Sequence, residues 1–179
     1  MRIVAGRFGG RRLTAPPGLD TRPTGDRVRE SLFSILGPLH GARVLDLFAG
    51  TGALGLEALS RGAAHATFVE RDRRALDALG ANIDAFGLDQ DEALVVRGDY
   101  RRALRDAGAR GEAYDLVLLD PPYRDASGIA PVLDTALRPL LREGATVVTE
   151  SDRRSPMHLD LGGADERRYG DTLIRIHRP

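Results

Sequence analysis

The sequence predicts an α/β fold with a seven-stranded, mostly parallel sheet, helices on both of its faces, and a short N-terminal β-hairpin. From residue 43 onward, short apolar runs alternate with segments of helical periodicity, which is typical of parallel strands joined by crossover helices. After residue 156 this alternation stops, and two strand-like runs flank a turn, which indicates an antiparallel end to the sheet. The 179 residues are enough for one domain with a sizeable core.

The N-terminal part begins with two strand-like runs, 2–6 and 11–15, separated by Arg7-Phe8-Gly9-Gly10, which predicts the hairpin. Turn-forming residues then fill 16–26, and we expect an ordered loop there. Apolar residues at helical spacing predict a helix over 26–36, with Asp26 as its cap and its arginines on the outer face.

The alternating part supplies five strands and the helices between them. The expected strands are 43–48, 65–70, 93–99, 114–120 and 145–151, and the expected helices are 52–60, 72–86, 100–107 and 128–141. The antiparallel end is expected from strands 157–161 and 172–177.

Composition excludes several kinds of site. The chain has no cysteine, so disulfides, thiolate metal sites and a cysteine nucleophile are excluded. Its four histidines have no metal-ligand spacing, and we expect no metal. No apolar run is long enough to cross a bilayer, and the first ten residues do not look like a signal peptide, so we expect a cytoplasmic protein without a membrane partner.

The net charge is zero, but the charge is unevenly distributed. Residues 1–43 hold eight arginines and three acids, for a net of +5, and the remainder holds 18 arginines and 23 acids, for a net of −5. Arginines gathered near the N-terminus favour a polyanionic partner, although a solvated tail would have the same composition.

A glycine-rich loop, GTGALG at 50–55, follows the first strand of the alternating part, and Glu70 lies 20 residues after Gly50. This spacing satisfies the dinucleotide-binding pattern of an NAD-type enzyme. Asp46, however, precedes the loop, and its carboxylate would repel a pyrophosphate. S-adenosylmethionine carries an ammonium and a sulfonium and suits this position better, while Glu70 can accept hydrogen bonds from both ribose hydroxyls.

Acidic residues end four successive strands: Asp46, Glu70, Asp99 and Asp120. Each alone is as readily explained as a turn or cap residue. Because ligands of open α/β sheets bind at the carboxyl ends of the strands, four in order predict a site at this edge, with Asp99 near an adenine amino group.

The fourth strand ends in DPPY, residues 120–123. Two prolines hold the chain extended and remove backbone donors. The Asp120 carboxylate and the Pro121 carbonyl can then accept the two hydrogens of an exocyclic amine, while Tyr123 offers a face on which a base can stack. The alternative is that DPPY is only a structural turn in which the prolines end the strand. Beside the glycine loop, DPPY favours methylation of a nucleobase amine.

Several motifs resemble class I S-adenosylmethionine-dependent methyltransferases, namely DLFAGTGALG (46–55), VERD (69–72), GD (98–99) and DPPY. Others resemble the RsmD-type bacterial enzymes that methylate guanine N2 in 16S ribosomal RNA: RIVAGRFGGRRL (2–13), TRPTGDRVRESLFSIL (21–36), EALSRGA (57–63) and RRYGDTLIRI (167–176). The resemblance covers essentially the whole chain.

The resemblance implies a Rossmann-like methyltransferase that acts at the position numbered 966 in the family name, on the small ribosomal subunit or its assembly intermediate, as a monomer. It divides the chain into an RNA-contacting arm, 1–25, and a methyltransferase domain, 26–179, within one compact unit. Catalytic roles fall on Asp120, Pro121 and Tyr123. The implied cofactor-binding residues are Asp46, Phe48, Gly50, Gly52, Glu70, Arg71, Asp99 and Tyr100. The implied RNA-binding residues are Arg2, Arg7, Arg11, Arg12, Arg22 and Thr24.

Other functions share parts of this pattern. A DNA or tRNA amine methyltransferase would also carry DPPY, and only the resemblance selects guanine N2 over adenine N6. The glycine loop taken alone would also fit an NAD-type oxidoreductase or a nucleotide-binding regulator. The N-terminal positive charge taken alone would also fit an inactive RNA-binding protein.

Overall fold

The computed structural model describes residues 1–16, 25–122 and 126–179. Its helices are α1 (Asp26–Leu36), α2 (Ala53–Ser60), α3 (Arg73–Phe86), α4 (Tyr100–Ala109), α5 (Ala126–Leu137) and the 3₁₀ helix η1 (Arg138–Leu140). Its strands are β1 (Arg43–Asp46), β2 (His65–Glu70), β3 (Ala93–Arg97), β4 (Tyr114–Leu119), β5 (Leu141–Asp152), β6 (Ala164–Tyr169) and β7 (Thr172–His177). No helix among these residues is both long enough and apolar enough to span a membrane.

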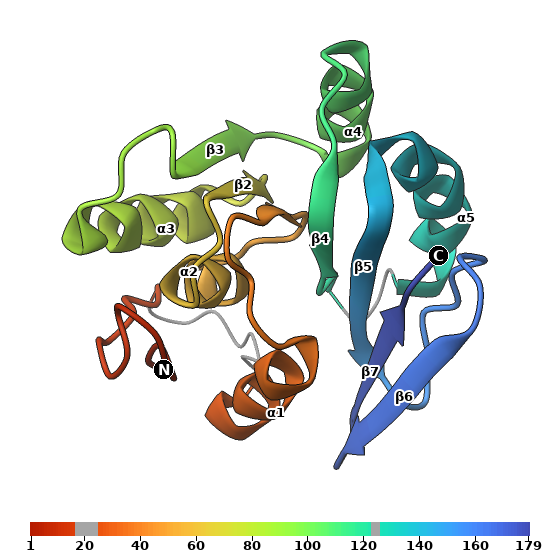
Figure 1. Cartoon of the computed structure of the whole chain (residues 1–179), viewed down its shortest axis with the longest axis horizontal. Helices are drawn as coiled ribbons and strands as arrows, with labels where there is room; N and C mark the ends of the chain where they lie inside the picture. The colour runs from red at the N-terminus through yellow and green to blue at the C-terminus, as the bar shows by residue number, and fades with distance from the viewer. Residues whose placement is uncertain (17–24, 123–125) are drawn as a thin grey trace.

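The strands form one seven-stranded sheet in the order β3-β2-β1-β4-β5-β7-β6 (Figure 1). The first five strands in this order are parallel, and β7 and β6 add an antiparallel end. The predicted fold class, a mostly parallel sheet with helices, is therefore confirmed. The order reverses between β1 and β4, which lie side by side although two strands separate them in the chain.

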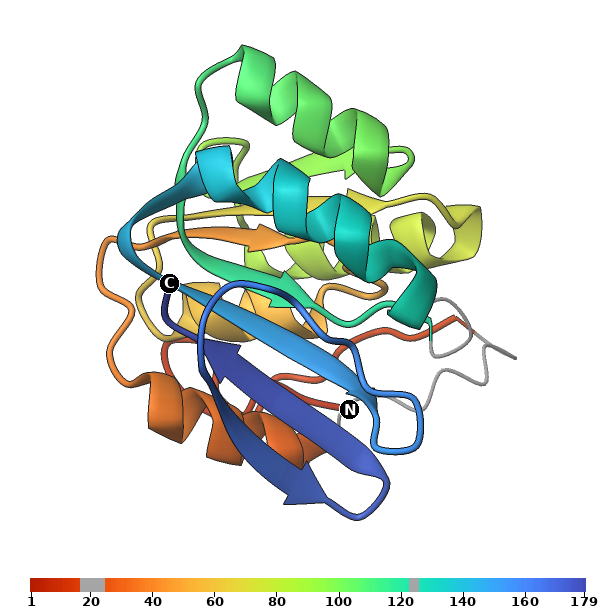
Figure 2. The same ribbon diagram turned by 90° about the vertical axis from the view of Figure 1, so that its right-hand side faces the viewer.

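Helices cover both faces of the sheet (Figure 2). On one face, α1, α2 and α3 pack over a core that includes Val44, Phe68, Leu118 and Val148. On the other face, α4 and α5 pack over residues of the opposite parity in the same strands. Burial on both faces explains why the central strands are nearly continuous apolar runs in the sequence.

The predicted strand 157–161 is wrong. Met157, Leu159 and Leu161 are buried, which explains their alternation, but they pack in the core beside α5 and belong to no strand of the sheet. The edge strand is instead β6, ADERRY, which pairs with β7 along its whole length. Most of its side chains are exposed and polar, so the sequence carries no hydrophobic signal for it.

The N-terminal segment, residues 1–16, contains a single antiparallel bridge between Arg2 and Arg12 in place of the two expected strands. Ile3 N donates to Arg11 O at 3.0 Å, and Leu13 N donates to Met1 O at 3.2 Å. Ile3 and Leu13 are both buried in the core of the α1–α3 face. Packing against the protein body, more than strand pairing, holds this segment in place.

Helix α1 has the predicted bounds, but two details of its prediction are wrong. Its cap is Gly25, and Asp26 is the first helical residue. Arg29, expected on the outer face, is fully buried. A charged side chain is buried there because a carboxylate of another helix, Glu57 of α2, meets it in the interior.

Candidate active site

The glycine loop leads from β1 to α2. Gly50 and Gly52 have φ values of 55° and 83°, a region that favours glycine. A Cβ on Gly52 would lie 2.5 Å from Leu79 Cδ1 of α3, so α3 packs directly on the loop. A Cβ on Gly50 would meet no atom within 4 Å, so the backbone of Gly50 is open to approach.

Asp46, the last residue of β1, is 1% exposed and accepts a hydrogen bond from Gly55 N at 2.9 Å. Burial raises the pKa of this carboxyl from 3.8 to about 7; the Gly55 bond opposes the shift, and the nearby charge of Glu70 adds to it. A cationic group placed beside Asp46 would favour its ionised form. The carboxylate therefore suits a positively charged ligand.

We expect this raised pKa to make stability depend on pH. Between 3.8 and about 7 the folded state holds a proton that the unfolded state has lost, so stability falls as pH rises through this window. Asp46→Asn stays neutral at every pH. We compare the unfolding free energies of the variant and the wild type by urea denaturation at pH 5 and at pH 8. The difference, variant minus wild type, should rise by about 2–3 kcal/mol from pH 5 to pH 8. A difference that is constant with pH would contradict this pKa.

Glu70, the last residue of β2, holds the glycine loop against its own strand end. Its Oε2 accepts from Gly50 N at 2.8 Å, and its Oε1 accepts from Arg71 N and Asp72 N at 2.7 and 2.8 Å. A carboxylate has about four lone-pair sites, so these three bonds leave about one site, on Oε2, for a ligand hydroxyl. The Arg71 side chain is exposed next to it.

Asp99 begins α4 two residues after β3 and caps this helix by accepting from Arg101 N at 2.9 Å. Asp99 is therefore a helix-capping residue, which was the non-functional interpretation of this acid. The rings of Phe48 and Tyr100 lie 5.3 Å apart beside it. Tyr100 is buried in the core, and the partly buried Phe48 ring packs on it, so an apolar surface lies near a polar acceptor, an arrangement suited to a flat heterocycle.

Asp120 directly follows β4, and Pro121 behind it is buried. Because Asp46 pairs with Leu118 in the parallel register, Asp120 lies two residues beyond the position opposite Asp46. Side chains alternate between the two faces of a strand. Asp46, Glu70 and Asp120 each come two residues after a residue of the core on the α1–α3 face, namely Val44, Phe68 and Leu118, so they belong to the same set of alternating positions. Tyr123 lies outside the described residues.

Glu150 is an acidic residue of this edge that the sequence reasoning missed. It lies in β5, two residues after Val148, and is 3% exposed. Leu119 pairs with Thr149, so the same register places Glu150, within β5, beside Asp120. The signal in the sequence was an acid inside the expected apolar strand 145–151, not at its end.

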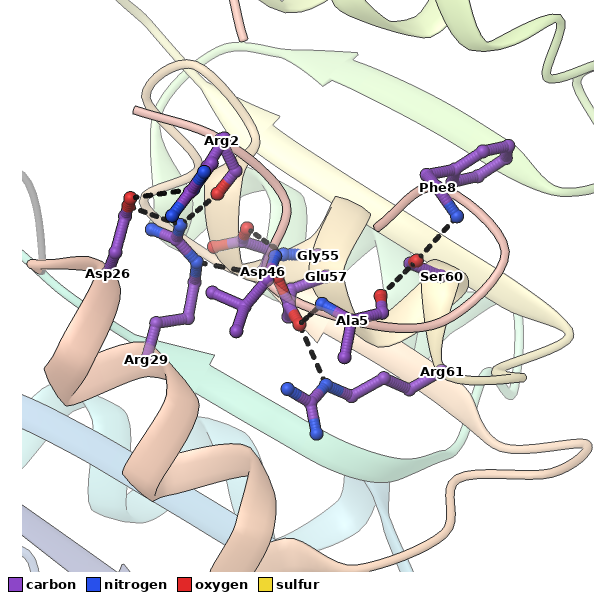
Figure 3. A network of polar contacts seen from close by, with 11 residues as sticks. Arg2, Ala5, Phe8, Asp26, Arg29, Asp46, Gly55, Glu57, Ser60 and Arg61 are labelled. Atoms are coloured by element: carbon purple, nitrogen blue, oxygen red, sulfur yellow. Dashed lines mark hydrogen bonds and ion pairs between the residues drawn. The ribbon is translucent and has the colours of Figure 1, made fainter. Parts of the chain in front are cut away.

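A buried polar network joins α2 to the N-terminal segment (Figure 3). The fully buried Glu57 carboxylate accepts from Val4 N at 2.7 Å and from Ala5 N at 3.1 Å. Arg61 Nε donates to it at 2.7 Å, and Arg29 Nε lies 3.5 Å from it. The helix that starts at the glycine loop thereby also fixes the N-terminal segment.

The predicted RNA-binding arginines of this segment differ in their surroundings. Arg7 pairs with Glu92 at 2.5 Å and lies over the Phe8 ring, while Arg11 lies over Phe86. Arg2 lies 3.8 Å from Asp26. Within the part of the chain that the structure describes, Arg12 is exposed and makes no ion pair. Arg22 and Thr24 lie outside the described residues.

Comparisons with known proteins agree with this architecture. The chain is 39% identical over 182 residues to the "Putative rRNA methyltransferase YlbH" of Bacillus subtilis, covering 99% of this chain and 98% of that one. It is 44% identical over 125 residues to the "Ribosomal RNA small subunit methyltransferase D" of Escherichia coli, covering 69% of this chain and 61% of the relative.

Solved structures share the fold. The "Putative methyltransferase yhhF from Escherichia coli" superposes with a TM-score of 0.84 at 35% identity, over 99% of this chain and 97% of that one. A "putative sam-dependent methyltransferase from Streptococcus mutans" has the same fold, with a TM-score of 0.69 at 19% identity, over 84% of this chain and 47% of that one. The family model described as "Conserved hypothetical protein 95" matches residues 1–178, and the chain therefore belongs to this family, the RsmD-type family that its motifs resemble.

Proposed function

We propose that this protein transfers a methyl group from S-adenosylmethionine to an exocyclic amine of ribosomal RNA. The observation that carries the proposal is the convergence of Asp46, Glu70 and Asp120 on neighbouring strands of one sheet edge, beside the glycine loop. The B. subtilis and E. coli relatives, which are described as rRNA methyltransferases, support ribosomal RNA as the substrate.

The residues at this edge fit S-adenosylmethionine. The open backbone at Gly50 allows close approach, and the Asp46 carboxyl favours a cationic neighbour. Glu70 would accept from a ribose hydroxyl at its remaining lone-pair site, and Asp99 would face the adenine near Phe48 and Tyr100. When bound, S-adenosylmethionine supplies the methyl group that is transferred.

The chain's own contribution to the reaction would be positioning and electrostatics. The amine nitrogen of a nucleobase is conjugated with the ring and is a poor nucleophile. Asp120 and the Pro121 carbonyl would each accept one of its hydrogens, which favours a pyramidal nitrogen with a free lone pair. That lone pair forms the new N–C bond as the S–C bond breaks, and the amine then loses a proton to water.

We further propose guanine N2 of 16S rRNA, presented by the small subunit, as the target. The sequence motifs at 21–36 support this choice, and the E. coli relative described as a small subunit methyltransferase agrees with it. Phosphate contacts would orient the ribonucleoprotein, and the pocket would select an unpaired or flipped base.

Nucleoside mass spectrometry tests this function. Small subunits from cells that lack the protein should gain one N2-methylguanosine when incubated with the protein and S-adenosylmethionine. DNA and tRNA serve as controls and should gain none. Methylation at adenine N6, or of DNA in preference to subunits, would move the assignment to the alternative amine methyltransferases, and tight NADH binding without S-adenosylmethionine binding would move it to an oxidoreductase.

Arg12 is the arginine of the N-terminal segment for which we expect the clearest RNA effect. Arg12→Ala should weaken binding to small subunits and lower the slope of log K against log salt by about 0.7–0.9, the value for one phosphate contact. Fluorescence titrations at several salt concentrations would measure it. Arg102→Ala on α4 changes another exposed arginine outside the N-terminal segment; it is the control and should leave the slope unchanged.

A further inference from the structure

Asn82 of α3 is a buried amide that joins two segments far apart in the chain. It is 1% exposed, and its Oδ1 accepts from Thr14 N at 2.7 Å. Its Nδ2 donates to Thr14 O at 3.1 Å and to Thr51 O at 3.0 Å. One side chain therefore binds both the N-terminal segment and the glycine loop.

The chemistry of these contacts requires an amide at residue 82. Thr14 presents a donor and an acceptor, and Thr51 presents a second acceptor. Only a side chain with one acceptor and two donor hydrogens satisfies all three groups, and asparagine has both. A carboxylate would turn an acceptor toward two carbonyl oxygens, and an apolar side chain would leave these three partly buried backbone groups without this partner.

The contacts of Asn82 lie where the glycine loop and the N-terminal segment both meet α3. Thr51 lies between Gly50 and Gly52, whose positive φ values set the shape of the loop. The same face of α3 carries Leu79, which contacts the loop at Gly52, and Phe86, whose ring stacks on Phe8 at 4.8 Å. Helix α3 is thus a rigid support that holds the loop on one side and the N-terminal segment on the other.

We infer that Asn82 is a positioning residue that couples cofactor binding at the glycine loop to the N-terminal segment, which is part of the expected RNA-contacting arm. This inference rests on the proposed function for the identity of the ligands. Cofactor contacts that fix the Thr51 peptide strengthen the Asn82 bond and so order Thr14. By reciprocity, RNA that orders the N-terminal segment increases the affinity of the protein for the cofactor.

Hydrogen–deuterium exchange tests the link without any RNA. In the wild-type protein, S-adenosylhomocysteine should slow exchange in peptides covering residues 11–16 by several-fold, because Thr14 N–H donates to Asn82. Asn82→Leu should abolish this slowing and weaken S-adenosylhomocysteine binding on the order of ten-fold. Asn82→Asp keeps the size and the acceptor for Thr14, and it provides the same measurement if the leucine variant does not fold.

Ser60→Ala is the matched control. Ser60 accepts from Phe8 N at 2.9 Å and donates to Ala5 O, so it holds the same segment without touching the glycine loop. This variant should keep the slowing and bind S-adenosylhomocysteine within about two-fold of wild type. Unchanged exchange in the wild-type protein, or equal slowing in the Asn82 variants, would overturn the inference. Slowing that depends on Asn82 in a protein that fails to methylate small subunits would support the link and contradict only the proposed function.

Discussion

Replacing Asp120 with alanine should reduce methyl transfer to small subunits by about 10²-fold or more while S-adenosylmethionine binding is kept. The carboxylate would accept an amine hydrogen and hold the nitrogen in line, and removing one such electrostatic contact costs about 10²–10³ in rate. Asp120 follows β4 at the edge where Asp46 and Glu70 end their strands, and alanine in its place offers no side-chain acceptor. Initial rates with tritiated methyl donor, together with calorimetry, measure the two effects.

The control for this variant lies on the same strand. Asp115 belongs to β4 near its other end, where it accepts from Arg43 N at 2.7 Å and pairs with Arg142 at 2.9 Å. Asp115→Ala should lower thermal stability and leave the rate per folded molecule near wild type. Wild-type transfer by Asp120→Ala, or an equal loss in both variants, would show that Asp120 has no special role in the reaction.

The largest loss of stability is expected from Glu57→Ala. The substitution leaves the fully buried Arg29 without its carboxylate partner in α2, and it removes the acceptor of Val4 N and Ala5 N. Breaking a buried ion pair from one side costs about 3–5 kcal/mol. Since a domain is stable by only about 5–15 kcal/mol, this variant should be close to unfolding at 37 °C, as urea denaturation would show.

Two further variants separate a buried-charge effect from general damage. Glu57→Leu combined with Arg29→Met removes both charges and should be less destabilised than Glu57→Leu alone. Asp106→Ala breaks an exposed pair with Arg102 at 3.6 Å and should change stability by less than about 1 kcal/mol. If the double variant is the least stable, the Arg29 charge is not the cause of the loss.

The parallel part of the fold could be predicted because its strands are buried on both faces. Strand β2 has the predicted bounds, since an apolar run ends there in one acid. Strand β5 starts four residues earlier than expected, because the exposed residues 142–144 continue the strand without an apolar signal. β6 could not be predicted, since its polar residues reflect exposure at the sheet edge and not the backbone pairing that defines it.

Some residues of the candidate site and its surroundings could likewise be predicted from the sequence, and others could not. Asp46, Glu70 and Asp120 could be gathered from sequence because the carboxyl ends of parallel strands meet at one edge. Arg29, Glu57 and Asn82 could not, because their burial depends on contacts between segments 27 to 68 positions apart. A charged or amide residue on a helix is solvent-exposed in most sequences, so only the tertiary structure identifies these anchors.

The burial of Ile3 and the Glu57 bonds to Val4 and Ala5 bear on how the N-terminal segment should be studied. Removing residues 1–6 would leave a cavity where Ile3 packs and would take two backbone donors from the Glu57 carboxylate of the helix that follows the glycine loop. A truncated protein would therefore lose packing behind the candidate site together with Arg2, and the two effects could not be separated. Point changes at exposed arginines, and not deletion, are the experiments that isolate substrate recognition from folding.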